Sequence, residues 1–303
     1  LEPLVGAAPL SDPTVTLITL SDIHARLDVA REILEGVGFI QRGVRRDGLD
    51  DKVIAEPGTI VLVGGDEIDR GLWPFYTMRW LDHIQDRAPK HGCSVERGLG
   101  DHELFYLLRT ADGKWKGLMD VLVAKKALRG IDTELWNVKK NFDGVAQIIK
   151  DGILSGRRIG VYEKGDTVFA HGVITSKLIR AFNEELALNE RAVHLTQPRI
   201  FMEAVNSAVI RAVNSNTYDS VIFEQGLRRR HLWRVGAYRK GFRYVDGFTS
   251  AYVDRMKNID LPFHQVVFHS PRSFEAEGRI AVEARANESL IPADVGMFLS
   301  NQE

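Results

Sequence analysis

Cysteine is nearly absent from this sequence, since Cys93 is the only one among 303 residues. A single thiol excludes an internal disulfide framework and any cysteine-rich zinc module, and we expect Cys93 to be buried as a small apolar group. Long apolar runs are also lacking, because none approaches the ~18 residues that span a bilayer. We therefore expect no membrane span and a soluble, preferably cytoplasmic chain, with a processed or secreted form left open.

The sequence also lacks an excess of charge of either sign. The 40 Lys and Arg residues nearly balance the 41 Asp and Glu residues, which leaves a formal net charge of −1. Such a chain creates no overall field that attracts nucleic acid or an acidic membrane. We expect no nucleic-acid partner, and any binding of anions has to be local.

Apolar strand-like segments alternate with helical patterns along the chain, which is typical of an α/β fold. We expect residues 1–13 to form an extended lead-in and residues 14–303 to form a single domain. Between residues 110 and 160, lysines and arginines mix with apolar residues, and this texture favours an inserted helical cap. The cap could be a solvated helical face or a lid over an anionic substrate.

Side chains that bind metals follow five of the expected strands. They are Asp22 and His24, Asp66, Asp101 and His102, His171, and His269. We interpret each set as a loop at the end of a strand, and such loops meet at one edge of a sheet. Carboxylates mixed with imidazoles suit Mn²⁺, Fe or Zn²⁺. Six or seven ligands are too many for one ion but fit two ions bridged by a carboxylate.

The same five segments, in order, resemble the motifs of the calcineurin-like metallophosphoesterases. "SDIHAR" is similar to the GDxHG block of that superfamily, "GGDEIDRG" to GDxxDRG, "GDHE" to GNHE, "FAHGV" to the HGG block and "VVFHSP" to the GHTP block. The Asp-Arg-Gly of the second segment resembles the phosphoprotein phosphatase branch in its bacterial form. The resemblance implies a four-layer α/β/β/α sandwich with an inserted helical cap.

The resemblance also implies a role for each matching residue. The implied ligands of two divalent ions, with Mn favoured and Fe or Zn open, are Asp22, His24, Asp66, Asp101, His171 and His269. Asp66 would bridge the ions, and a hydroxide between them would attack phosphorus. His102 would be the general acid, with Asp69 as its partner. Arg70 would bind the phosphoryl oxygens, and Arg234 is a second substrate-binding candidate.

Several positions depart from the family pattern. Asp101 stands where the family has Asn, and it adds a negative charge to the site. Ala25 and Phe268 each stand where the family has Gly, which crowds the pocket but removes no ligand. Glu67 and Glu103, inside the motifs, are interpreted as structural residues.

The resemblance implies a dinuclear metal-dependent phosphatase that hydrolyses phosphomonoesters on phosphoproteins, at Ser/Thr or Tyr. One alternative is a phosphoanhydride hydrolase that acts on dinucleoside polyphosphates or nucleotides. Another is a catalytically weakened pseudoenzyme that binds a phosphorylated partner, an alternative kept open by Asp101. The expected partner is accordingly a phosphorylated protein or peptide, or a small phosphorylated metabolite.

Overall fold

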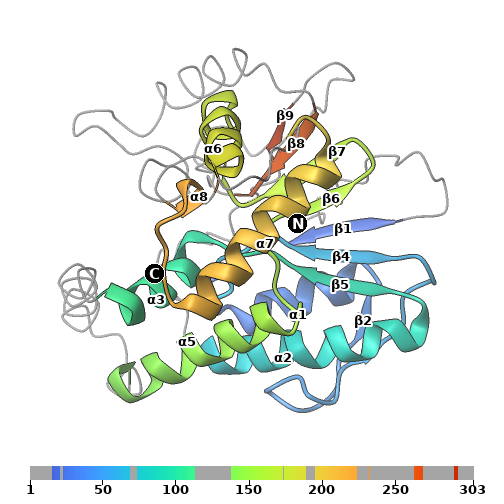
Figure 1. Ribbon diagram of the computed structural model, residues 1–303. Helices are drawn as coiled ribbons and strands as arrows, with labels where there is room; N and C mark the ends of the chain where they lie inside the picture. Colours follow the sequence, from blue (N-terminus) through green and yellow to red (C-terminus); the bar gives the residue numbers. More distant parts are fainter. Residues whose placement is uncertain are drawn as a thin grey trace, which may run out of the picture.

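Two larger β-sheets and one two-stranded sheet, with helices around them, make up the described part of the chain (Figure 1). The computed structural model describes residues 16–20, 23–68, 74–112, 138–172, 174–188, 195–223, 232, 263–268 and 290–292. The expected lead-in, residues 1–13, lies outside these ranges. The α/β class expected from the sequence is confirmed, because helices alternate with mostly parallel strands.

The first sheet is wholly parallel. It contains β1 (Leu17–Leu20), β4 (Ile60–Val63) and β5 (Ser94–Arg97) in the order β1-β4-β5. Helix α1 (Leu27–Gly36) follows β1, and α2 (Pro74–Arg87) follows β4, with proline in its first turn as expected. Both helices pack on the same face of this sheet, where their apolar side chains form one core cluster with alternate residues of the strands.

The second sheet follows later in the chain and has the order β6-β7-β8-β9. Its strands are β6 (Tyr162–Lys164), β7 (Thr167–Ala170), β8 (His264–Val267) and β9 (Leu290–Pro292), and only the β6–β7 pair is antiparallel. The remaining helices are α3 (Asp101–Asp112), α5 (Val138–Leu154), α6 (Ser176–Leu188), α7 (Pro198–Ser215) and the short α8 (Val221–Phe223). The described residues also form a small hairpin of β2 (Ile40–Gln41) and β3 (Lys52–Val53) and a 3-10 turn at Ala88–His91.

The inner faces of the two sheets share a small apolar core. It joins strands of the first sheet to strands of the second through Leu17, Leu62, Phe169, Val266 and Phe268. The two sheets can pack this closely because a glycine at the end of one sheet faces a large aromatic ring at the end of the other. A Cβ atom on Gly64 would lie 2.2 Å from the Phe268 ring, so the ring fits because position 64 has no side chain.

The expected helical cap at residues 110–160 divides into two parts. Residues 113–137 lie outside the described ranges, so a cap there stays a prediction. Residues Val138–Leu154 form α5, whose Val145, Ala146 and Ile149 are buried in the main core cluster with residues of α3 and α7. This part of the segment therefore belongs to the body of the fold.

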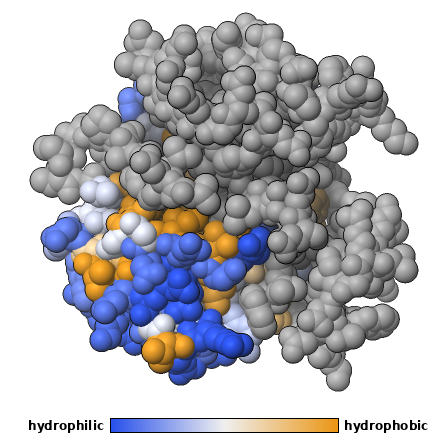
Figure 2. Space-filling model, turned by 180° about the vertical axis from the view of Figure 1, so that it is seen from behind, coloured by the Kyte–Doolittle hydropathy of each residue, from blue (hydrophilic) through white to orange (hydrophobic). Residues whose placement is uncertain are grey.

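The surface of the described residues carries scattered apolar side chains. The exposed large ones are Val44, Ile54, Tyr76, Leu154, Leu188 and Ile210. Figure 2 shows hydrophilic and apolar residues side by side on one face of the molecule. Among the helices of the described ranges, none is both long and apolar enough to cross a membrane. Cys93 is buried, as expected from the sequence.

Candidate metal centre

Five of the predicted site residues lie together at the ends of the strands. They are His24 after β1, Asp66 after β4, Asp101 and His102 after β5, and His171 after β7. Their ligand atoms form two overlapping groups, each within 4.8 Å: His24 with Asp66 and His102, and Asp66 with Asp101 and His171. Asp66 belongs to both groups, which is the arrangement expected of a bridging carboxylate.

Three imidazole rings converge on one oxygen atom of Asp66. The Nε2 atoms of His171, His102 and His24 lie 3.4, 3.7 and 3.8 Å from Asp66 Oδ2. The second carboxylate is close as well, because Asp101 Oδ1 lies 3.6 Å from His171 Nε2. Two atoms that each lie about 2.0–2.2 Å from one cation are roughly 3 to 4 Å apart. These separations therefore fit shared coordination.

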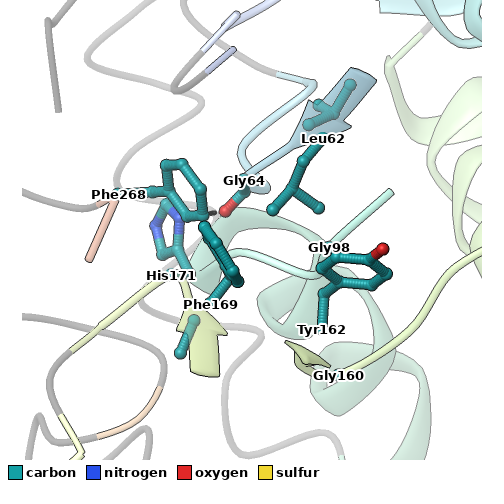
Figure 3. A pocket seen from close by; sticks show the side chains of 10 residues that line it. Leu62, Gly64, Gly98, Gly160, Tyr162, Phe169, His171 and Phe268 are labelled. Atoms are coloured by element: carbon teal, nitrogen blue, oxygen red, sulfur yellow. Dashed lines mark hydrogen bonds between the residues drawn. The ribbon is translucent and has the colours of Figure 1, made fainter. Parts of the chain in front are cut away.

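The opposite ring nitrogens of two histidines contact backbone carbonyls. His171 Nδ1 lies 2.9 Å from Gly64 O, and His24 Nδ1 lies 3.2 Å from Ile68 O. A carbonyl oxygen can only accept, so Nδ1 is the donor and the Nε2 of the neutral ring carries the lone pair. Metal-binding histidines are held in this way by their outer neighbours. Figure 3 shows His171 beside Gly64, with the Phe268 ring close by.

Burial separates His102 from the other four side chains. The side chains of Asp66 and His171 have no exposed area, those of Asp101 and His24 are 3% and 6% exposed, and that of His102 is 18% exposed. Burial alone would raise the pKa of Asp66, but the nearby His102, His171 and His24, when their rings carry positive charge, hold it well below its usual range. Two buried carboxylates need compensating positive charge, and a cation would provide it.

Asp101 does not lie in a loop, and that part of the sequence interpretation was wrong. Asp101 and His102 are the first two residues of α3, and Gly100 is the residue before the helix. Asp66 Oδ1 accepts a hydrogen bond from the His102 amide at 3.1 Å, as the side chain of an N-cap residue usually does. Gly100 leaves room for the Asp66 carboxylate at the start of α3, because a Cβ atom on residue 100 would lie 2.1 Å from Asp66 Oδ1.

Backbone strain is concentrated around these residues. Among the described residues other than glycine, four have a positive φ, and three of them are His24, Ala25 and Asp66. A residue with a Cβ atom is disfavoured in this left-handed region by roughly 1–2 kcal/mol. Hydrogen bonds fix the conformation, since the amides of His24 and Ala25 donate to the carbonyls of Asp66 and Glu67 at 2.8 Å. Strain of this kind is typical of functional sites.

A buried charge network is centred on Glu67, the residue that follows Asp66. Glu67 accepts a bidentate pair of hydrogen bonds from Arg97, at 2.6 and 2.5 Å, and a third from Arg158 at 3.1 Å. Arg97 also contacts Asp82. Burial alone would raise the pKa of Glu67, but the charges of Arg97 and Arg158 outweigh burial and lower it to about 2. The sequence signals neither arginine as part of the site, because both lie outside the five motifs.

The other sequence-predicted site residues lie outside the described ranges. They are Asp22 and His269 among the ligands, Asp69 and Arg70 among the catalytic residues, and Arg234 as a substrate-binding residue. Asp22 and His269 each neighbour a described segment, at residues 23–68 and 263–268. Their roles stay predictions.

Comparison with known proteins shows that the fold of this chain is similar to that of a solved structure. No protein-family model matches the sequence, so the resemblance to the metallophosphoesterases depends on the motifs quoted above. Over 109 residues, the chain is 30% identical to the uncharacterized protein C1840.07c of Schizosaccharomyces pombe (strain 972 / ATCC 24843). This match covers 36% of the chain and 30% of the yeast protein, well under two thirds of its length.

Among solved structures, the cold-active protein-tyrosine phosphatase of a psychrophilic Shewanella species matches with a TM-score of 0.50. It is 17% identical, and the match covers 92% of this chain and 70% of that protein. The phosphatase domain of the Legionella effector WipB matches with a TM-score of 0.43 at 14% identity, over 71% of this chain and 87% of that domain. At 17% identity, the Shewanella match shows a shared fold.

Proposed function

We propose that this chain is a metal-dependent phosphatase that hydrolyses phosphomonoesters, with phosphoproteins as the favoured substrates. The observation that carries the proposal is the orientation of His24 and His171. Their Nδ1 atoms contact backbone carbonyls, while their Nε2 atoms face one oxygen of the buried Asp66. The shared fold of the Shewanella protein-tyrosine phosphatase supports a phosphatase activity.

Four described residues would hold two divalent ions, with Mn favoured and Fe or Zn open. They are His24, Asp66, Asp101 and His171, and we propose that Asp22 and His269 complete the set. Bound cations of this class polarise phosphoryl oxygens and make water a nucleophile near neutral pH. Asp66 would serve both ions, because it is common to both groups of side chains.

His102 is the proposed proton donor to the leaving oxygen. It is the most exposed of the five clustered side chains, at 18%, so it is the one best placed to reach a substrate. A general acid has to come within hydrogen-bonding reach of the leaving group, whereas a buried ligand does not. Asp69 is proposed to orient His102, and Arg70 and Arg234 to bind the phosphoryl oxygens, as guanidinium geometry favours.

We also propose that the fold is the four-layer α/β/β/α sandwich of the calcineurin-like metallophosphoesterases. The apolar core shared by the two sheets supports this, since two packed sheets form the middle of such a sandwich. Helices α1 and α2 cover the outer face of the first sheet.

A substrate panel tests the proposed activity. Metal-free protein would be supplied with Mn²⁺ and assayed on phosphotyrosyl and phosphoseryl peptides and on a dinucleoside polyphosphate, with Asp66→Asn as the inactive control. The proposal predicts Mn-dependent release of phosphate from at least one class of peptide. Turnover of the dinucleoside polyphosphate alone would favour the phosphoanhydride hydrolase. Binding of a phosphopeptide without any turnover would favour the pseudoenzyme.

A further inference from the structure

Glu103 is a buried carboxylate that takes no part in the proposed chemistry. It is the third residue of α3, directly after Asp101 and His102, and it is 1% exposed. Its side chain contacts backbone amides. Glu103 Oε2 accepts from the amides of Asp66 and Gly100 at 2.9 and 2.8 Å, and Glu103 Oε1 accepts from the Glu67 amide at 2.8 Å. One carboxylate therefore binds the loop after β4 to the loop after β5.

The two loops that Glu103 joins approach each other more closely than side chains would allow. A Cβ atom on Gly65 would lie 2.5 Å from the Gly100 amide nitrogen, and a Cβ atom on Gly100 would lie 2.4 Å from the Asp66 amide nitrogen. Asp66 itself has the left-handed φ of 53°. Three amide groups thus point into one small buried space, where each needs an acceptor.

A carboxyl group suits this space because its two oxygens together can accept from all three amides. Glutamine has the same shape, but its NH₂ group would have to face at least one of the three amide donors. We propose that Glu103 is a positioning residue, whose three hydrogen bonds hold the Asp66 backbone so that the Asp66 carboxylate faces His24 and His171. This inference depends on the proposed metal site.

A purely structural role is the competing explanation. The contact with the Gly100 amide is half of a capping box, in which the third helical residue reaches back to the N-cap amide. If Glu103 only stabilised α3, its replacement would lower thermal stability and leave the metal affinity of the folded protein unchanged. The contacts with Asp66 and Glu67 lie outside the helix, and they predict a loss of affinity instead.

Asp51 provides a matched control, because the donors that contact it lie in α1, in α2 and after β2 and not in the strand-end segments of the centre. It is 1% exposed and accepts hydrogen bonds from Arg31, from Trp80 and from the Gly43 amide, at 2.6 to 2.8 Å. Replacing it with Asn removes a buried acceptor of the same type without touching the metal centre. Asp51→Asn should therefore lower the thermal midpoint but bind Mn²⁺ with the affinity of the wild type.

The test is the affinity of the folded protein for Mn²⁺, measured by competition with a chelator well below the thermal midpoint. Loss of an outer neighbour of a ligand commonly costs about 10–100-fold in metal affinity, and we expect a loss in this range for Glu103→Gln. Binding within about twofold of the wild type would overturn the proposal. If Glu103→Gln does not fold, Glu103→Asp takes its place with the same two outcomes, because its shorter side chain keeps the carboxyl group but cannot span the three amides.

Hydrogen exchange separates this proposal from the proposed function. It would be measured without metal, on peptides that cover residues 64–68 and 98–101. Faster exchange of these segments in Glu103→Gln, with no change in Asp51→Asn, supports the contact with the amides, and unchanged exchange overturns it. A wild-type protein that binds no Mn²⁺ would contradict the proposed function, and the exchange result would then decide the role of Glu103 alone.

Discussion

Gly100→Ala is the smallest change that should disable the centre. General rules for helices predict a modest loss of stability, because alanine is a poorer N-cap residue than glycine by about 1 kcal/mol, although it lowers the entropy of the unfolded chain. The structure predicts a much larger effect on the centre. The added Cβ atom would lie 2.1 Å from Asp66 Oδ1 and 2.4 Å from the Asp66 amide nitrogen, whereas ordinary contact begins near 3.4 Å. Asp66 would have to move by about 1 Å to restore an ordinary contact distance. Metal sites tolerate shifts in ligand distance of only ~0.2 Å, so this movement would disrupt the centre.

The expected magnitude follows from that displacement. A 1 Å misplacement of a catalytic group can cost about 100-fold in rate, so we expect at least that loss in kcat/KM and a similar loss in Mn²⁺ affinity. Overpacking of a buried site usually costs about 1–3 kcal/mol of stability. In a chain of 303 residues, this corresponds to a fall of only a few degrees in Tm. The variant should thus fold but bind Mn²⁺ much more weakly than the wild type.

Gly144→Ala is the control, because Gly144 lies within α5 and its added Cβ atom would meet only the end of the Phe75 ring, at 4.0 Å. Alanine should stabilise this helix by roughly 0.5–1 kcal/mol and leave activity unchanged. The assay is p-nitrophenyl phosphate turnover with Mn²⁺, together with calorimetry for Tm. Turnover of Gly100→Ala within a few-fold of the wild type would refute the close approach of Gly100 and Asp66.

Three further substitutions test separate parts of the site. Asp101→Asn removes a negative charge next to His171. It should therefore loosen metal binding, strengthen inhibition by phosphate and lower the pH optimum. Titration with phosphate and a pH–rate profile measure these changes. His102→Asn should keep the metals and lose about 10²–10⁴-fold in rate on alkyl phosphates, but much less on aryl phosphates, and equal losses on both would argue against a general acid. Glu67→Gln should cost about 3–5 kcal/mol in urea unfolding, since it leaves Arg97 and Arg158 buried without their partner. The pKa of Glu67 falls from 4.5 to about 2 on folding. The stability that the ion pair contributes is therefore fully present above pH 4.5 and is lost as the pH falls toward 2. A destabilisation by Glu67→Gln that does not depend on pH would contradict the ion pair.

The parallel strands and the candidate ligands that follow them could be predicted from the sequence because each strand is an apolar run followed by a polar segment. The segments around β1, β4, β5, β7 and β8 all show this pattern, and the structure brings His24, Asp66, Asp101, His102 and His171 together as expected. The short strands β2, β3 and β6 were not expected, since two or three residues are too few to show a period of two.

The start of α3 could not be placed because its cap is built from two parts of the chain. Helices usually begin after a Ser, Thr, Asp or Asn whose side chain accepts from the first turn. Here the preceding residue is Gly100, and the acceptor is Asp66, 36 positions earlier than His102. Glu103, three residues after Gly100, was the one local signal of a capping box.

Buried charge pairs were also beyond the sequence pattern. Arg31 lies on the apolar stripe of α1 and is buried, because Asp51 accepts two hydrogen bonds from its guanidinium group. Arg97 and Arg158 are buried through Glu67 in the same way. Each partner is at least 20 positions away in the sequence, so no local periodicity reveals the pairing.

The central claim is that Asp66 and the imidazoles around it form a two-ion centre that makes the chain a phosphatase. The most direct measurement is a titration of metal-free protein with Mn²⁺ that follows bound ions and p-nitrophenyl phosphate turnover in the same samples. We predict about two ions per chain at saturation, turnover that rises with occupancy, and neither binding nor turnover in Asp66→Asn. Full turnover of the metal-free protein in the presence of a chelator would contradict the account.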